Sequence, residues 1–397
     1  MITIKEVQER LNKKYGDGAV VPGGKVVRDV PRIPTGVFAV DFTTGGGFPI
    51  WRTVCLWGPP SAGKSTLALL AMAGASRICW KCFKYKAMCK CKKPLYKKSA
   101  YIDVEGTVDA SWANSVGVND KDYFYLSPDT GEDAVNMADN IIQADDCGLI
   151  VVDSLAMLEP SVELDASAED MQVGLQARLV AKMFRKITAR VIQARKDGRT
   201  VSAIFINQVR AKIGGAGGGF AHGPQESQPA GYAARFAYSL SMRIGSRYIN
   251  PSKEPNKFDS HGKPLVVKSS VKINKHKVMA LALAGEYEIV RSVYGNYPPG
   301  TILDYATTLN AAKEYGLFTK QGSKYILKKS LDDENGAEYK TQKALIEKLR
   351  ASPTGFRIFK MLVIDEAKRV EIEAAKREVE NGNGGDLYFT DVENKCV

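Results

Sequence analysis

A glycine-rich segment at residues 58–65 reads Gly-Pro-Pro-Ser-Ala-Gly-Lys-Ser and leaves few folds open to this chain. It follows an apolar run at residues 53–57, and a segment with helical spacing of apolar residues, 63–77, overlaps its end. A strand, a glycine-rich loop and a helix in this order match the GxxxxGK[ST] pattern, whose backbone N–H groups surround phosphate oxygens at the start of the helix. The segment therefore predicts a phosphate-binding loop in an α/β sheet rather than an ordinary strand–helix turn.

Four positions supply the chemistry that such a loop requires. Lys64 would neutralise the β- and γ-phosphates, and the hydroxyl of Ser65 would bind Mg²⁺. An apolar run ends at Asp153, where a carboxylate that holds the same metal ion is expected. Glu105 follows another apolar run and is the candidate for orienting the attacking water, although the pattern alone also fits a surface carboxylate. ATP and Mg²⁺ are therefore the expected cofactors.

Apolar runs alternate with longer amphipathic segments between residue 53 and about residue 245. The expected strands are residues 53–57, 100–104, 149–153 and 202–207, and the expected helices are residues 63–77, 131–145 and 169–196. Continuous apolar strands separated by helices indicate a mostly parallel α/β sheet that is covered on both faces. Strand-like stretches at residues 236–244, 265–274 and 286–291 are expected to extend this sheet.

Changes of composition along the chain predict four segments. A short helix and a linker, which dock on the body or on a neighbouring subunit, precede a large core, and a small α+β domain and a flexible tail follow it. The segments are residues 1–33, residues 34–297 with a cysteine-rich insertion at 77–98, residues 298–380 and residues 381–397. The expected fold class is therefore an α/β P-loop NTPase core with a short N-terminal helix and a small C-terminal α+β domain.

The charge of the chain points to an anionic partner. The net charge is +12, but residues 361–397 carry nine acidic and five basic side chains, so the first 360 residues carry about +16. A basic body favours binding of a polyanion, and a generally basic protein with a solvated acidic tail is the simpler alternative. Charge alone does not separate DNA from RNA or from a membrane surface.

Four cysteines fall within 13 residues, Cys79, Cys82, Cys89 and Cys91. Four thiolates so close together suit a tetrahedral Zn²⁺ ion, which would fold an insertion too small to have its own core. Reduced cysteines or a redox pair are the alternatives. The insertion also carries nine basic residues and no acidic ones, interleaved with Trp80, Phe83, Tyr85 and Tyr96. This mixture favours contact with nucleic acid, chiefly a second, duplex partner, unless the aromatic residues only cover the zinc site.

A resemblance to a known family rests on five segments: Gly58–Thr66, Tyr101–Glu105, Pro128–Glu132, Val151–Ser154 and Phe205–Arg210. These segments occur in the same order as in RecA recombinases, and their spacing is similar outside the cysteine-rich insertion. The resemblance extends from about residue 33 to about residue 294 of this chain. The resemblance implies a core of RecA type that forms a helical filament on single-stranded DNA and catalyses homologous pairing and strand exchange with DNA-stimulated ATP hydrolysis. A ring motor of the same superfamily, a helicase or branch-migration ATPase, is the nearest alternative. A non-enzymatic single-strand-binding protein would leave the phosphate-binding loop without a purpose.

The resemblance also assigns roles to individual positions. It makes Glu105 the catalytic carboxylate and Gln208 the residue that senses the γ-phosphate. Lys275 and Lys277 match a lysine pair that completes the ATP site of the neighbouring subunit, and residues two apart on a strand face the same way. The same spacing also fits a solvated edge strand. The nucleotide-binding positions are Gly58, Pro59, Pro60, Ser61, Ala62, Gly63, Lys64, Ser65, Thr66, Asp109 and Trp112.

Two stretches match the DNA-binding loops of that family. Residues 209–229 form a long glycine-rich stretch in the place of the second loop, and such a loop in a compact domain is usually functional or disordered. Residues 163–174 match the first loop and lead into a helix on which residues seven apart share one face, which also fits a solvated helix. The DNA-binding candidates are Arg178, Arg185, Arg210, Lys212, Gly214 and Gly215. Ala230 and Tyr232 depart from a Gly and an Asn of the family pattern, so contacts just after the second loop are not carried over.

The expected partners are single-stranded DNA, homologous duplex DNA and further copies of the chain. A single-strand-binding protein and a loading mediator are additional candidates. No apolar run approaches the roughly 20 residues needed to cross a bilayer, and the first residues have no secretory pattern. We therefore expect a cytoplasmic, nucleoid-associated protein without a membrane partner. The short N-terminal region and the modest acidic tail fit a divergent, bacteriophage-encoded member that acts in the host cytoplasm.

Overall fold

The computed structural model of the chain describes residues 2–15, 20, 30–162, 174–211, 226–227, 238–277, 280–322, 324–327 and 337–380. Contacts between residues divide the chain into two compact units. The first comprises residues 1–33, 48–248 and 271–279, and the second comprises residues 34–47, 249–270 and 280–397. The division of the sequence at residues 33, 297 and 380 remains a prediction.

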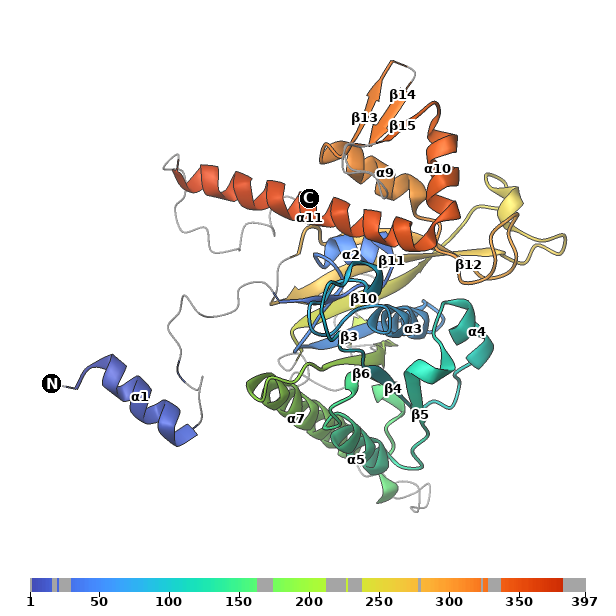
Figure 1. The fold of residues 1–397 in the computed structure, drawn as a ribbon. Helices are drawn as coiled ribbons and strands as arrows, with labels where there is room; N and C mark the ends of the chain where they lie inside the picture. Colours follow the sequence, from blue (N-terminus) through green and yellow to red (C-terminus); the bar gives the residue numbers. More distant parts are fainter. Residues whose placement is uncertain are drawn as a thin grey trace, which may run out of the picture. The chain divides into compact units, whose positions relative to one another are not determined.

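A parallel sheet forms the centre of the first unit (Figure 1). Its strands, in spatial order, are β10 (Leu240–Arg247), β3 (Thr53–Gly58), β7 (Ser202–Gln208), β6 (Cys147–Asp153), β4 (Lys98–Asp103) and β5 (Tyr123–Leu126). All five neighbouring pairs are parallel, and every residue of β3 and β6 is buried. Strands β11 (Val266–His276) and β12 (Ala284–Val290) bring the sheet to eight strands. The predicted mostly parallel α/β sheet is thereby confirmed.

The order of the strands decides which loops meet at one edge of the sheet. The carboxyl ends of parallel strands lie at the same edge, which is where ligands bind in open α/β sheets. Gly58, at the end of β3, is the register partner of Gln208 at the end of β7. Asp103, at the end of β4, is the partner of Asp153 at the end of β6, and β6 pairs with β7. Four segments that are far apart in the sequence therefore end side by side.

Helices cover both faces of this sheet. On one face, α5 (Gly131–Ile141) and α7 (Leu175–Lys196) join every second residue of the strands in one apolar core. Cys55 and Trp57 of β3 belong to that core, so Val54 and Leu56 point to the opposite face because side chains alternate along a strand. There α3 (Lys64–Ala75) packs against β3, β4, β6 and β7. The sheet is thus buried from both sides, as its continuous apolar strands predicted.

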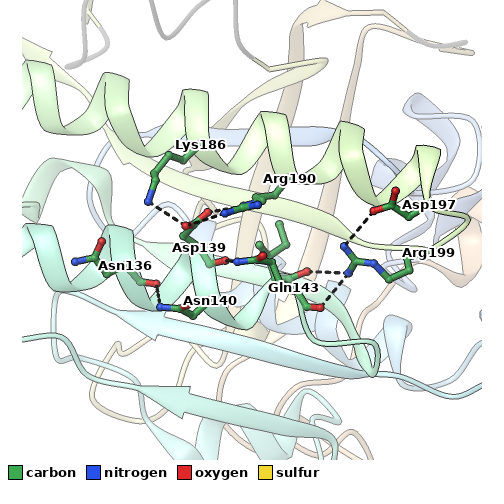
Figure 2. Close-up of polar contacts among 9 residues, drawn as sticks. Asn136, Asp139, Asn140, Gln143, Lys186, Arg190, Asp197 and Arg199 are labelled. Carbon is green, nitrogen blue, oxygen red and sulfur yellow. Dashed lines mark hydrogen bonds and ion pairs between the residues drawn. The ribbon is translucent and has the colours of Figure 1, made fainter. Parts of the chain in front are cut away.

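Charged groups hold α5 against α7, as Figure 2 shows. Asp139 of α5 accepts a hydrogen bond from Nε of Arg190 at 2.7 Å and one from Nζ of Lys186 at 3.0 Å, both from α7. The hydrogen bond from the Arg190 guanidinium lowers the pKa of Asp139 to about 2. Burial raises this pKa, and Lys186 lowers it further. Arg199, just after α7, donates to the main-chain oxygens of residues 142 and 143 at the end of α5. The pairing of the two helices therefore depends on these ion pairs as well as on apolar packing.

The second unit is a small α+β arrangement. Its elements are α2 (Phe38–Thr43), β12, α9 (Tyr305–Glu314), β13 (Phe318–Gln321), β14 (Lys324–Leu327), β15 (Ala337–Tyr339), α10 (Gln342–Ala351) and α11 (Pro353–Glu380). The strands β13, β14 and β15 form an antiparallel sheet. Lys360 of α11 pairs with Asp304 at 2.6 Å, with both side chains buried, and Asp304 also accepts the backbone N–H of Phe38. This pair links the N-terminal part of the unit to its C-terminal helix.

The remaining helices and strands are short or peripheral. They are α1 (Ile4–Tyr15), β1 (Arg32–Ile33), β2 (Phe48–Pro49), α4 (Ala110–Ser115), β8 (Arg210–Ala211) and β9 (Glu226–Ser227). Strand β5 and helix α4 were not predicted, because β5 is a partly exposed edge strand and α4 has a single buried residue. Among the residues that the structure describes, no helix has the length and apolar character needed to cross a bilayer. Residues 163–173, 212–225 and 381–397, which carry several predictions, lie outside the described residues.

Candidate functional site

The glycine-rich segment connects β3 to α3, as its sequence pattern predicted. Two of its glycines are required by the backbone. A Cβ atom on Gly58 would lie 2.0 Å from the main-chain oxygen of Ile244 in β10, and Gly63, the N-cap of α3, has a φ of +93°. The first N–H groups of a helix have no acceptor within the helix, and a glycine-rich loop before α3 with these N–H groups is the arrangement that binds phosphate.

Lys64 is buried at the start of α3 and turns back toward the loop. Its Nζ donates to the main-chain oxygen of Pro59 at 2.7 Å and to that of Gly58 at 3.1 Å. Burial lowers the pKa of this ammonium, and the carboxylates of Asp153 and Glu105 act in the opposite direction. These carboxylates favour the charged form, which is the form that would bind phosphate oxygens.

Asp153, at the end of β6, forms the metal side of the site. The hydroxyl of Tyr101 in β4 donates to Oδ2 of Asp153 at 2.5 Å, and the Ser65 hydroxyl hydrogen-bonds the same carboxylate. Among the residues described, Oδ1 of Asp153 is buried without a hydrogen-bond partner. Burial, partly offset by the Ser65 and Tyr101 hydroxyls, raises the pKa of Asp153. An unpaired carboxylate oxygen beside a serine hydroxyl fits the all-oxygen coordination that Mg²⁺ prefers.

Glu105 and Gln208, which are 103 positions apart, meet at this edge of the sheet. The Nε2 of Gln208 lies 3.3 Å from Oε1 and 3.5 Å from Oε2 of Glu105. The backbone N–H groups of Val104 and Glu105 donate to the main-chain oxygen of Asp153 at 2.7 and 3.3 Å. This fixes the segment after β4 to the end of β6. A carboxylate and an amide are thus brought together at the sheet edge where the phosphate-binding loop begins, because Gln208 is the register partner of Gly58.

The sequence reasoning missed Asp103, the last residue of β4, which is only 2% exposed. Its Oδ1 accepts the N–H of Gly106 at 2.8 Å, and its Oδ2 accepts the N–H of Val108 and the hydroxyl of Tyr125, both at 3.0 Å. The carboxylate therefore holds the turn that carries Glu105. A carboxylate that ends an apolar strand two positions before Glu105 was the available signal.

Trp112 and Asp109 lie at the start of α4, which follows this turn. The indole Nε1 of Trp112 donates to the hydroxyl of Thr66 at 3.1 Å, so the ring lies beside the phosphate-binding segment. Asp109 caps α4 by accepting the N–H groups of Ser111 and Trp112, and the Ser111 hydroxyl, followed by these N–H groups, lowers its pKa. The base-binding role expected of Trp112 and Asp109 remains a prediction, and the structure adds that Trp112 contacts Thr66 of the phosphate-binding segment.

The predicted lysine pair lies at the end of β11. Lys275 is partly buried, with Nζ 5.4 Å from the centre of the Tyr238 ring, whereas Lys277 is exposed and follows the last residue of the strand. Burial, with a further contribution from the ammonium of Lys277, lowers the pKa of Lys275. The two cations are therefore close enough to repel each other, and a shared anion would relieve that repulsion.

Three cations on α7 share one exposed side. Arg178 and Arg185, which the spacing placed on one face of a helix, are both exposed, and Lys182 between them, which was not singled out from the sequence, is exposed as well. Arg210 begins β8. The remaining DNA-binding candidates, Lys212, Gly214 and Gly215, lie outside the described residues.

The four clustered cysteines converge. The sulfurs of Cys79, Cys82, Cys89 and Cys91 all lie within 4.8 Å of one another, and those of Cys82 and Cys89 are 3.7 Å apart. Sulfurs about 2.3 Å from a tetrahedral zinc ion are roughly 3.8 Å apart, so the cluster has nearly the dimensions of a metal site. Trp80 and Tyr85 of the insertion are buried. Those two aromatic rings are therefore packed within the structure and do not offer an exposed face for stacking on bases.

Comparison with known proteins gives a consistent result. The model of the RecA N-terminal domain matches residues 2–293. Protein RecA of Saccharopolyspora erythraea is 33% identical over 318 residues, which are 80% of this chain and 80% of that protein. Protein RecA of an Arthrobacter species is 35% identical over 316 residues, 79% of this chain and 78% of that protein. Protein RecA of Porphyromonas gingivalis is 31% identical over 321 residues, 80% of this chain and 84% of that protein. Both the matched length and the identity, together with the site at the sheet edge, show that the chain belongs to the RecA family.

Proposed function

We propose that this chain is an ATP-dependent homologous recombinase that forms a helical filament on single-stranded DNA. In this proposal it pairs that strand with homologous duplex DNA and exchanges strands, and DNA stimulates its ATP hydrolysis. The observation that carries the proposal is the meeting of the phosphate-binding loop with Asp153, Glu105 and Gln208 at the ends of four neighbouring strands. In a member of the RecA family, this arrangement supports hydrolysis of ATP.

Each residue of the proposed ATP site has a separate role in hydrolysis. The loop N–H groups and Lys64 bind the phosphates, and Ser65 and Asp153 would hold Mg²⁺, which supplies positive charge to the phosphate oxygens. Glu105 accepts a hydrogen bond from the attacking water and directs it at the γ-phosphorus. Both reactants are thus held in line by groups at the ends of rigid strands.

Gln208 is suited to report the state of the nucleotide. Its amide contacts Glu105 only at 3.3 to 3.5 Å, a weak interaction that a γ-phosphate can replace. Gln208 ends β7, and residues 209–229, the proposed second DNA-binding loop, follow at once. A change of partner at Gln208 therefore reaches the DNA-binding loop through the chain itself.

Assembly completes the proposed sites. Lys275 and Lys277 would reach the ATP of the neighbouring subunit and stabilise the charge that develops during hydrolysis. Single-stranded DNA would contact Arg178, Arg185, Arg210 and the glycine-rich loop with Lys212, Gly214 and Gly215, through phosphates and therefore without reading sequence. The N-terminal helix would dock on a neighbouring subunit. A single-strand-binding protein and a loading mediator are proposed further partners in a cytoplasmic, nucleoid-associated complex.

A structural Zn²⁺ ion is proposed for the four cysteines, because their sulfurs converge within 4.8 Å in a segment without a core of its own. Elemental analysis of the purified protein is expected to find one zinc per chain. Replacing Cys82 and Cys89 by serine together should remove it, whereas replacing the isolated Cys55, buried in β3, should not. Metal-free wild-type protein with four titratable thiols in the insertion would disprove the site.

The decisive experiment compares ATP hydrolysis with and without single-stranded DNA and images the complexes by electron microscopy. The recombinase predicts strong stimulation by single-stranded DNA and helical filaments. Closed rings on DNA would instead support a ring motor of the same superfamily. DNA binding without any ATP hydrolysis would support a simple single-strand-binding protein.

A further inference from the structure

The cysteine-rich insertion carries most of the net charge of the chain. Residues 77–98 contain nine basic and no acidic side chains, whereas the whole chain has a net charge of +12, so the other 375 residues contribute only +3. Four ionised thiolates around one divalent cation would subtract two charges and still leave about +7. Such a concentration of like charge repels itself in a folded segment, and binding of a polyanion relieves that repulsion.

Most of these cations point to solvent. Lys97 and Arg77 are the exceptions. Lys97 is buried, and its Nζ donates to the main-chain oxygens of Thr200 at 2.9 Å and Cys147 at 3.4 Å. Arg77 is partly buried and donates to the main-chain oxygen of Gly117. The exposed cations, here called the lysine face, are Lys81, Lys84, Lys86, Lys90, Lys92, Lys93 and Lys98.

The lysine face is built on an ordered scaffold rather than a loose loop. Trp80 is 1% exposed, lies against Gly148 of β6, and donates its indole N–H to the main-chain oxygen of Ala75 in α3. Backbone pairing between Ile78 and Tyr85 closes the first half of the insertion, and the four sulfurs gather at its centre. The backbone positions that carry the lysines are therefore fixed relative to one another, which lowers the entropy lost when they bind an extended partner.

The chemistry of the lysine face favours phosphates over bases. Non-specific binding of single strands relies on aromatic rings that stack on exposed bases. Trp80 and Tyr85 are buried, and the exposed ring of Tyr96 already has the Nζ of Lys86 4.4 Å above it. Seven cations with so little stacking surface match the regular phosphate charges of a duplex, about one per 1.7 Å of helix axis.

We propose that the lysine face is a docking surface for duplex DNA, separate from the residues that bind the single strand. This rests on the proposed recombinase function, in which the filament must capture a second, duplex partner. The lysine face would hold that duplex through its phosphate backbone without regard to sequence, and the zinc site would keep the lysines in place.

The test replaces Lys90, Lys92 and Lys93 together by glutamine. A matched control replaces Lys253, Lys263 and Lys313, three exposed lysines of the second unit, which removes the same charge elsewhere. Binding of a fluorescent duplex of unrelated sequence to filaments preformed on single-stranded DNA is measured over a series of salt concentrations, alongside DNA-stimulated ATP hydrolysis. The expected result is an affinity for duplex about 10- to 100-fold lower and a salt dependence flatter by about two to three counterions. The control should keep wild-type values, and both variants should keep full hydrolysis with single-stranded DNA.

Two results would overturn the proposal. One is a Lys90, Lys92 and Lys93 variant that binds duplex with the affinity and salt dependence of the control. The other is equal loss of hydrolysis stimulated by single-stranded DNA, which would place the lysine face in the primary DNA site. If single-stranded DNA does not stimulate hydrolysis by the wild-type protein, the proposed recombinase function is itself wrong. This outcome is distinct, because it is seen before any lysine is replaced.

Discussion

Asp103 should set the rate of hydrolysis without touching the nucleotide. Its carboxylate accepts three hydrogen bonds, from the backbone of Gly106 and Val108 and from the hydroxyl of Tyr125. The first two close the turn on which Glu105 stands. In an Asp103→Asn variant the side chain has nearly the same shape but only one accepting oxygen, so its NH₂ group must face either the N–H of Gly106 or that of Val108.

The free-energy cost of the Asp103→Asn substitution follows from these contacts. A buried N–H left without an acceptor costs about 1–3 kcal/mol, and the hydrogen bonds that remain lose the strength of a charged acceptor. If the turn after β4 moves so that both N–H groups find acceptors, Glu105 is displaced from the line of attack. If the same 1–3 kcal/mol is lost from the transition state, kcat falls about 5- to 150-fold. ATP affinity should change little, because Lys64 and the loop are intact.

The assay compares single-turnover hydrolysis and ATP affinity in Asp103→Asn, in Tyr125→Phe and in Asp139→Asn. Tyr125→Phe removes one bond to Asp103 but leaves both backbone bonds, so it should lose little activity. Asp139→Asn breaks the ion pairs between α5 and α7, and it should lower stability by a similar amount while leaving kcat near the wild-type value. An Asp103→Asn enzyme with normal kcat would refute the reasoning. So would a loss of kcat in Asp139→Asn that parallels its loss of stability.

Three further predictions follow from the same structure. Lys64→Ala should weaken ATP binding, measured by calorimetry, whereas Glu105→Gln should bind ATP normally and lose turnover; normal turnover would remove Glu105 from the mechanism. Replacing Lys275 and Lys277 by alanine should lower DNA-stimulated hydrolysis but leave nucleotide binding by monomers intact, and weaker monomer binding would place both lysines in their own subunit's site. The lowered pKa of Asp139, about 2 against an ordinary 3.8, contributes stability that is present above about pH 4 and lost as the pH falls toward 2. Urea unfolding should show this contribution of about 1–2 kcal/mol in wild type and not in Asp139→Asn; parallel pH profiles would contradict it.

The local parts of the site could be predicted from sequence patterns. Gly58 and Gly63 are required by a close backbone approach and a positive φ, so a short glycine pattern between an apolar run and a helix identified the loop. The strands β3 and β6, which are buried on both faces, appear in the sequence as unbroken apolar runs, and such runs predicted a parallel sheet. The resemblance gave Glu105 and Gln208 separate roles, but no spacing rule relates residues so far apart, and their contact was found only in the structure.

Which strand ends are neighbours, and which side chains are covered, depends on packing between distant parts of the chain and could not be predicted from sequence patterns. Periodicity shows which faces of a strand are buried but not which strand lies beside it, and the partners of Asp103 come from both its own turn and β5. Trp80 and Tyr85 alternate with lysines in the sequence, as residues that stack on bases do, yet both are buried. An aromatic side chain has the same sequence signature whether it stacks on a base or fills a core, and only the packing around it determines which of the two it does.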